Sequence, residues 1–194
     1  MKAIETRYAG CRFRSRLEAR WAVFFTRSGI AWQYEPQGFL IAGRPYLPDF
    51  LLTDCGTWVE VKGAESELDH GLMLAAAEHL PDMGCKKESG PRLLILGPVP
   101  EPPASGDLGW IGLDPIAGSF EGDDDLIICD RWWGFGRYSK NLRPWVLVNT
   151  SRCTPADDDE GDWLVPALDS DEPEGSAAAY TAARSARFEH GEKG

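Results

Sequence analysis

Residues 46–62 read YLPDFLLTDCGTWVEVK, and this stretch decides the fold. It holds two runs rich in apolar and β-branched residues, 46–52 and 58–62, on either side of a Thr-Asp-Cys-Gly segment. Extended runs around a short polar segment with a glycine are typical of a β-hairpin. The sequence therefore predicts two antiparallel strands joined by a tight turn.

Alternation along the second strand separates its charged residues from its apolar ones. Glu60 and Lys62 share one face and Val61 points to the other, because successive residues of a strand face opposite sides. A two-residue turn in the middle of the stretch pairs residues whose numbers sum to 109, which puts Asp49 opposite Glu60 at about 5 Å. A bulge at Gly56 would shift this register.

Two carboxylates at that separation repel each other, so a rigid hairpin that holds both favours a divalent cation between them. Ligation by oxygen alone indicates Mg²⁺, with Mn²⁺ as a substitute. Such an ion polarises a phosphoryl oxygen and lowers the pKa of a bound water, and Lys62 lies where an ammonium would orient that water or offset charge on the phosphate. The alternative is that Glu60 and Lys62 form an ordinary solvated strand face.

Further elements follow on both sides of the hairpin. Ser15, followed three residues later by Glu18, has the pattern of a capping box, and apolar residues then recur at helical spacing. Ser66 is the expected cap of a second helix, which stops at Pro81. The predicted elements outside the hairpin are a helix at 15–28, a strand at 31–35, a helix at 66–80 and a strand at 93–96.

Four short segments carry a resemblance to a known family. They are Arg16–Arg20 (RLEAR), Tyr34–Pro36 (YEP), Tyr46–Phe50 (YLPDF) and Glu60–Lys62 (EVK). Over residues 12–97 the chain resembles the PD-(D/E)XK nucleases, the restriction-endonuclease-like superfamily, and in particular its small phage-type and transposon-type members. The resemblance implies an α/β fold with a restriction-endonuclease-like core of helix, three-strand antiparallel meander, helix and strand, here with a β-rich C-terminal extension.

The resemblance also implies a set of site residues. Asp49, Glu60 and Lys62 match the superfamily motif, and Glu18 matches the helix glutamate that many members place beside the metal. The expected metal ligands are Asp49, Glu60, the main-chain carbonyl of Val61 and Glu18, and the expected catalytic residues are Glu18, Asp49, Glu60 and Lys62. Glu18 has a competing structural role as the third residue of the capping box.

The distribution of charge indicates where nucleic acid would bind. The whole chain has a formal net charge of −11, which taken alone argues against a nucleic-acid partner. Residues 1–48, however, hold eight basic and three acidic residues, a balance of +5 that leaves −16 for the remainder. Arg12, Arg14 and Arg16 alternate around the start of the first helix and are the candidate phosphate-binding residues, the alternative being a solvated face.

The C-terminal half is organised differently. We predict a nuclease core at 1–98, a β-rich aromatic extension at 99–155, an acidic linker at 156–174 and a final helix with a tail at 175–194. The linker has nine acidic residues and no basic one, and it either restrains the enzyme by covering the basic face or touches nothing. The aromatic residues of the extension stack on unpaired bases or, as is commoner, form a core.

These features predict a Mg²⁺-dependent endonuclease that hydrolyses DNA, with no small-molecule cofactor. A structure-selective role in recombination, repair or phage DNA processing is favoured over sequence-specific restriction, because no recognition domain is evident. The alternatives are a catalytically weak nuclease-fold subunit that binds DNA or a protein, and an RNA nuclease. Cutting a duplex would favour a homodimer. The five scattered cysteines are expected to be reduced, and without a signal peptide or a membrane-length apolar run the protein is expected in the cytoplasm.

Overall fold

The computed structural model describes residues 6–83, 92–99, 110–117, 126–136, 146–149 and 176–188. The helices are α1 (Arg16–Arg27), α2 (His70–His79) and α3 (Ser176–Ser185), with a short 3-10 helix, η1 (Glu65–Glu67), before α2. The strands are β1 (Thr6–Tyr8), β2 (Cys11–Phe13), β3 (Trp32–Tyr34), β4 (Phe39–Ile41), β5 (Arg44–Tyr46), β6 (Phe50–Leu52), β7 (Thr57–Val61), β8 (Leu93–Leu96), β9 (Trp110–Ala117), β10 (Leu126–Gly136) and β11 (Val146–Asn149).

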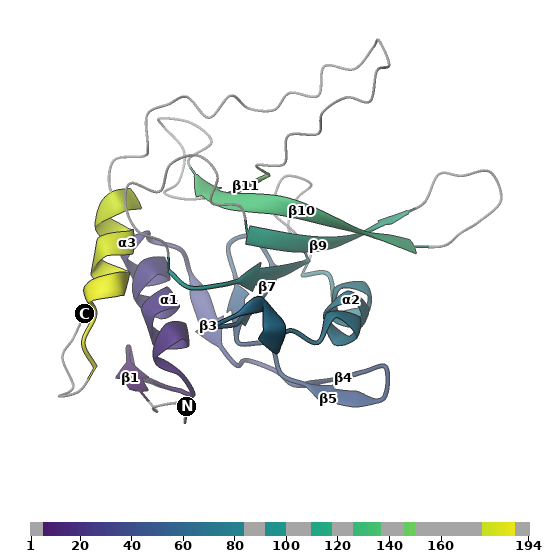
Figure 1. Cartoon of the computed structure of the whole chain (residues 1–194), viewed down its shortest axis with the longest axis horizontal. Coiled ribbons are helices and arrows are strands. Elements are labelled where there is room, and N and C mark those ends of the chain that lie inside the picture. The colour runs from purple at the N-terminus through teal and green to yellow at the C-terminus, as the bar shows by residue number, and fades with distance from the viewer. Residues whose placement is uncertain are drawn as a thin grey trace, which may run out of the picture.

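Seven of these strands form one sheet in the order β11-β10-β9-β8-β7-β6-β3. Helices α1 and α3 pack together on one face of this sheet, and α2 packs on the other (Figure 1). The pairs β1–β2 and β4–β5 form separate hairpins, which were not predicted from the sequence. The protein is therefore mixed α/β, as predicted, with two additional hairpins.

Helix α1 begins where the sequence predicted because Ser15 caps it. The Ser15 hydroxyl accepts a hydrogen bond from the backbone N–H of Glu18 at 3.1 Å. Trp21, Phe24 and Phe25 are fully buried in the core between the helix and the sheet. The cap and the aromatic face together hold α1, and with it Glu18, in a defined position.

Strands β3, β6 and β7 form the predicted antiparallel meander. The register of β6 and β7 pairs Phe50 with Val59 and Leu52 with Thr57, so that paired numbers sum to 109, as predicted. The turn is longer than predicted, because residues 53–56 all lie outside the ladder. Gly56 lies in this turn with a φ of 66°, a conformation that glycine adopts without strain.

The ladder between β6 and β7 ends at Phe50, one residue short of the predicted Asp49–Glu60 pair. Pro48 has no N–H to donate to a neighbouring strand, and the run predicted at 46–52 is divided there into β5 and β6. The N–H of Val61 instead donates to the Asp49 side chain at 2.7 Å. Strands β6 and β7 therefore separate at Asp49.

Strand β8 covers the predicted residues 93–96 and runs parallel to β7, with Val59 paired to Leu94. Helix α2 lies on the connection between these strands, as a parallel pair requires. The predicted cap Ser66 is wrong. The side chain of Asp69 caps α2 by accepting the N–H of Leu72 at 3.0 Å, and Ser66 lies in η1. Both residue types are good caps, so the choice depends on where the chain leaves β7.

The predicted extra strands within 99–155 are present as β9, β10 and β11, and they continue the central sheet beyond β8. The final helix is confirmed as α3, and its Tyr180 stacks on Phe24 of α1 with ring centroids 4.4 Å apart. The predicted acidic linker and the side chains of the aromatic extension lie outside the described residues. Cys11 and Cys55 form no disulfide among the residues that the structure describes. Within the described ranges, no helix is long and apolar enough to cross a membrane.

Candidate active site

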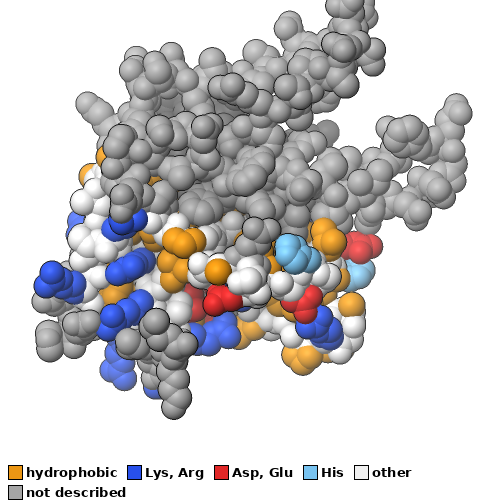
Figure 2. Space-filling model, in the orientation of Figure 1, with side chains coloured by type: hydrophobic (Ala, Val, Ile, Leu, Met, Phe, Trp, Pro, Cys, Tyr) orange, Lys and Arg blue, Asp and Glu red, His pale blue; other side chains and the backbone are white. Residues whose placement is uncertain are grey.

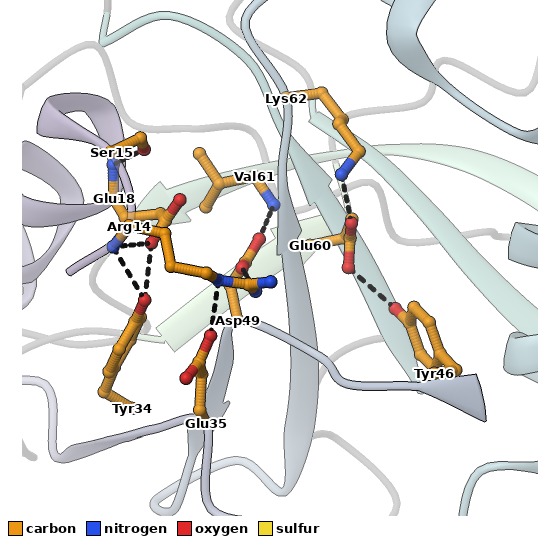
Figure 3. A network of polar contacts seen from close by, with 10 residues as sticks. All are labelled: Arg14, Ser15, Glu18, Tyr34, Glu35, Tyr46, Asp49, Glu60, Val61 and Lys62. Atoms are coloured by element: carbon orange, nitrogen blue, oxygen red, sulfur yellow. Dashed lines mark hydrogen bonds and ion pairs between the residues drawn. The ribbon is translucent and has the colours of Figure 1, made fainter. Parts of the chain in front are cut away.

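The candidate site lies where α1 approaches the ends of β6 and β7. Asp49 immediately precedes β6, Glu60 lies in β7, Lys62 immediately follows β7, and Glu18 comes from α1 (Figure 3). The acidic residues are buried, with exposed fractions of 3% for Asp49, 6% for Glu60 and 7% for Glu18. Three carboxylates with so little solvent need hydrogen-bond donors or a cation to compensate their charge.

The Asp49 carboxylate has a backbone donor on one oxygen and a cation on the other. Its Oδ2 accepts the Val61 N–H, and its Oδ1 accepts a bond from Arg14 Nη2 at 2.9 Å. Burial, followed by the charges of Glu60 and Glu18, raises the pKa of Asp49 to about 7, although the bond from Val61 and the charge of Arg14 oppose this. Charging Asp49 is therefore costly while no further cation is present.

Glu60 is held by two donors from the chain. The buried hydroxyl of Tyr46 donates to its Oε2 at 2.9 Å, and the Lys62 ammonium donates to its Oε1. Burial and the charge of Glu60 raise the pKa of Tyr46, so the hydroxyl stays protonated and acts as a donor. Burial lowers the pKa of Lys62, but its hydrogen bond to Glu60 and the charges of Glu60 and Asp49 together outweigh this effect, so the net pKa is raised. Lys62 is thus a cation, suited to donating hydrogen bonds and offsetting negative charge.

The capping role and the site role that were predicted to compete for Glu18 fall on different groups of this residue. The cap comes from the Ser15 hydroxyl, which accepts the Glu18 N–H. The Glu18 carboxylate does not complete the capping box, since its Oε2 accepts the Tyr34 hydroxyl at 2.6 Å and the backbone N–H of Arg14 at 3.1 Å. These contacts direct it toward the other carboxylates, and its charge contributes to the raised pKa of Asp49.

Arg14 is the cation nearest to Asp49. Its Nε lies 2.6 Å from Glu35 Oε1, while its Nη2 lies 2.9 Å from Asp49 Oδ1. Figure 3 shows the guanidinium between these two carboxylates, with Glu60 directed away toward Tyr46 and Lys62. Arg14 was predicted to bind phosphate, but in this structure it belongs to the cluster of charged residues at the site.

The other two candidate phosphate-binding residues, Arg12 and Arg16, lie on either side of Arg14 in the sequence. Arg12 is an exposed residue of β2 and is paired with Arg7 across the β1–β2 hairpin. Arg16 is the first residue of α1. The structure therefore brings Glu18, Asp49, Glu60 and Lys62 together as predicted, and it adds Arg14 to them.

Three further residues of the site were not predicted from the sequence. Tyr34 and Tyr46 each give a hydroxyl to one of the glutamates, and Glu35 binds Arg14. All three fall in the YEP and YLPDF segments that carried the resemblance, so those segments were the signal. Which carboxylate each residue contacts depends on packing between distant elements and is not visible in the sequence.

The residue types at the site suit Mg²⁺, since three buried carboxylates form an oxygen-only donor set. Their arrangement is not that of a ready coordination shell. Among the residues that the structure describes, no group of three or more His, Cys, Asp or Glu side chains could hold a metal ion as it stands. Asp49 is bonded to Arg14, and Glu60 to Lys62, where a cation would bind. The donor set therefore fits in its chemistry, but these contacts must be released before an ion binds.

Comparison with protein-family models, with curated proteins and with solved structures finds no match to this chain, so its function is inferred from the site itself.

Proposed function

We propose that this protein is a metal-dependent endonuclease that hydrolyses phosphodiester bonds in DNA. The observation that carries the proposal is the cluster of Asp49, Glu60, Glu18 and Lys62 at the separation of β6 and β7. Burying three carboxylates together destabilises a fold, as the raised pKa of Asp49 indicates. Such a cost at one end of a sheet is typical of a site that binds a cation and performs chemistry.

The order of elements supports a restriction-endonuclease-like fold. Helix α1 precedes the antiparallel strands β3, β6 and β7, and α2 then leads to β8, which is parallel to β7. This is the order of helix, meander, helix and strand that the resemblance to the PD-(D/E)XK superfamily implies. The hairpin β1–β2 precedes α1, and β4–β5 lies between β3 and β6 in the chain, so neither changes this order.

Each residue of the cluster has a distinct role in the proposed reaction. Asp49, Glu60 and the Val61 carbonyl, with Glu18 beside them, would hold Mg²⁺ or Mn²⁺. The ion, when bound, would polarise the phosphoryl oxygen and lower the pKa of the attacking water. The Lys62 ammonium donates a hydrogen bond to Glu60. In this position it would orient water or offset charge on the phosphate.

The basic residues on the surface beside the site favour a polyanionic substrate. Lys and Arg side chains gather on the left side of the molecule, where α1, α3 and β1 lie (Figure 1 and Figure 2). Arg7 and Arg12 are paired across the β1–β2 hairpin, which places two basic residues close together on this surface. We propose that DNA phosphates contact this surface, with Arg12 and Arg16 among the contacting residues.

One observation favours a second candidate function, a catalytically weak nuclease-fold subunit that binds DNA or a protein. The carboxylates already have partners from the chain, and no ready metal site exists among the described residues. A subunit of this kind would keep the ion pairs permanently and leave cutting to another protein.

A plasmid-nicking assay on the full chain separates the two candidates. We expect nicking with Mg²⁺ or Mn²⁺ and none with EDTA, and an RNA substrate in parallel tests the choice of nucleic acid. Asp49→Asn and Glu60→Gln should abolish nicking, whereas Asp54→Asn, in the exposed turn of the same hairpin, should not. Nicking by Asp49→Asn at the parent's rate would show that the site is wrong. DNA retention without nicking in any metal would favour the binding subunit.

The role of Lys62 is tested separately by Lys62→Met. This variant should lose most of its turnover while still binding Mn²⁺, because the lysine acts on water and phosphate and is not a ligand. A loss of Mn²⁺ affinity as large as that of Asp49→Asn would contradict the assignment.

A further inference from the structure

The contact between Arg14 and Asp49 lies where the proposed cation would bind. Asp49 Oδ2 is bonded to the backbone N–H of Val61, so Oδ1 is the oxygen that a cation would approach. That oxygen accepts Arg14 Nη2 at 2.9 Å. Arg14 thus neutralises the carboxylate through the same atom that a metal ion needs.

The backbone around Arg14 is built to keep it in place. The N–H of Arg14 donates to both the Glu18 carboxylate and the Tyr34 hydroxyl. Glu35 Oε1 lies 2.6 Å from Arg14 Nε, so the guanidinium has a second carboxylate partner besides Asp49. The four residues that contact Arg14, which are Glu18, Tyr34, Glu35 and Asp49, all belong to the site.

The backbone of Glu35 has a strained conformation. It follows β3 with a φ of 43°, a left-handed conformation that residues other than glycine seldom adopt. Its N–H donates to the Asp49 carbonyl at 2.9 Å, which ties this strained residue to the site. Strain of this kind persists where the surrounding structure needs the residue in one place. Here it holds a carboxylate against Arg14.

We propose that Arg14 is an internal counter-cation of the site, which a divalent ion must displace from Asp49. This inference rests on the proposed function and specifies how that site is regulated. The side chain of Arg14 is 57% exposed while that of Asp49 is 5% exposed, so the guanidinium can move into solvent without rearranging the core. Glu35 would retain the displaced side chain near the site. Metal affinity is then set by competition with the chain's own arginine.

Direct binding of Mn²⁺ tests this inference without relying on activity. The free ion is measured by electron paramagnetic resonance in titrations of the full chain at about pH 8, where the Asp49 carboxyl is mostly charged. The variants are Arg14→Gln, the matched control Arg12→Gln, Asp49→Asn and the double variant Arg14→Gln/Asp49→Asn. Arg12→Gln removes the same charge two residues away, on the exposed face of β2.

We expect Arg14→Gln to bind Mn²⁺ at least about tenfold more tightly than the parent, as loss of a competing charge-assisted contact implies. Arg12→Gln should differ from the parent by less than about threefold, because its charge is screened by solvent. The gain should vanish in the double variant. Equal affinities in Arg14→Gln and Arg12→Gln, with binding that still depends on Asp49, would overturn the inference and leave the proposed function intact. Binding that does not depend on Asp49 in either background would overturn both.

A measurement on the parent protein covers the case in which Arg14→Gln fails to fold. The Nε–Hε signal of Arg14 is observed by ¹⁵N nuclear magnetic resonance and assigned by its absence from Arg14→Lys. Titration with Mg²⁺ should shift this signal more than that of any other arginine, while the contact of Nε with Glu35 keeps its exchange with water slow. A signal that does not respond while Mg²⁺ binds would contradict displacement.

Discussion

In the metal-free protein, replacing Asp49 by Asn should stabilise the fold at alkaline pH and not at acidic pH. Burial, followed by the charges of Glu60 and Glu18, raises the pKa of Asp49 from 3.8 to about 7. At about 1.4 kcal/mol per pKa unit, the ionised carboxylate costs the folded state about 4 kcal/mol. This cost is absent below the unfolded pKa of 3.8, grows as the pH rises and is complete above the folded value.

The contact with Arg14 is already part of this cost, because its charge lowers the pKa of Asp49, and Asn keeps an acceptor for the Val61 N–H. The free energy of unfolding should therefore increase by about 4 kcal/mol at pH ~8 and by about zero at pH ~3.5. For a chain of this length a gain of about 4 kcal/mol raises the melting temperature by about 8–16 °C.

The assay is thermal and urea unfolding in EDTA at both pH values, with Asp54→Asn as the control. Asp54 lies in the exposed turn of the same hairpin and accepts the N–H of Ala31 at 3.1 Å, which Asn can also accept, so its substitution should change stability by less than about 1 kcal/mol. The difference between variant and parent cancels the titration of other groups. Two results would refute the idea that crowded carboxylates destabilise the apo fold. One is an Asp49→Asn protein less stable than the parent at pH ~8, and the other is a stability difference that is the same at both pH values.

Three other substitutions test separate contacts. Glu18→Gln keeps an acceptor oxygen, so stability should change by less than about 1 kcal/mol while the nicking rate falls at least about 100-fold. A normal nicking rate would restrict Glu18 to a structural role. Tyr46→Phe removes a buried hydrogen-bond donor from Glu60, so it should lower the free energy of unfolding in urea by about 1–3 kcal/mol and weaken Mn²⁺ binding. Unchanged Mn²⁺ affinity would mean that Tyr46 contributes only to packing. Tyr180→Ala should lower the free energy of unfolding by about 3–5 kcal/mol, because its ring is 4% exposed and fills the space between α1 and α3. A decrease of less than about 1 kcal/mol would show that α3 is not docked in solution.

Local patterns predicted those parts of the fold that depend on nearby residues. Ser15 caps α1 because its hydroxyl reaches an N–H three residues away, a contact that spacing alone determines. The β6–β7 register followed from the centre of the turn, because a two-residue turn and the observed four-residue turn about the same centre pair the same strand residues. The same register predicted that Asp49 and Glu60 would lie near each other, which made the candidate site visible in the sequence.

Contacts between distant elements could not be predicted in this way. The hydroxyls of Tyr34 and Tyr46 meet Glu18 and Glu60 only because separate strands and α1 converge at one end of the sheet. The split of the 46–52 run was readable in principle from Pro48, which cannot donate to a ladder. The position of Arg14 beside Asp49 depends on the path of the chain from β2 into α1, and residue type alone suggested phosphate binding instead.

The docking of α3 on α1 has a consequence for the order in which the protein is made. Phe24 and Tyr180 stack directly, and Arg184 donates to the carbonyl of Val99 at 3.0 Å. About 150 residues separate the two stacked rings, and synthesis at about 5–20 residues per second takes about 10–30 s to span them. During that interval the aromatic face of α1 lacks its partner helix. Chains that stop on the ribosome before α3 therefore carry Glu18 on an incompletely packed helix.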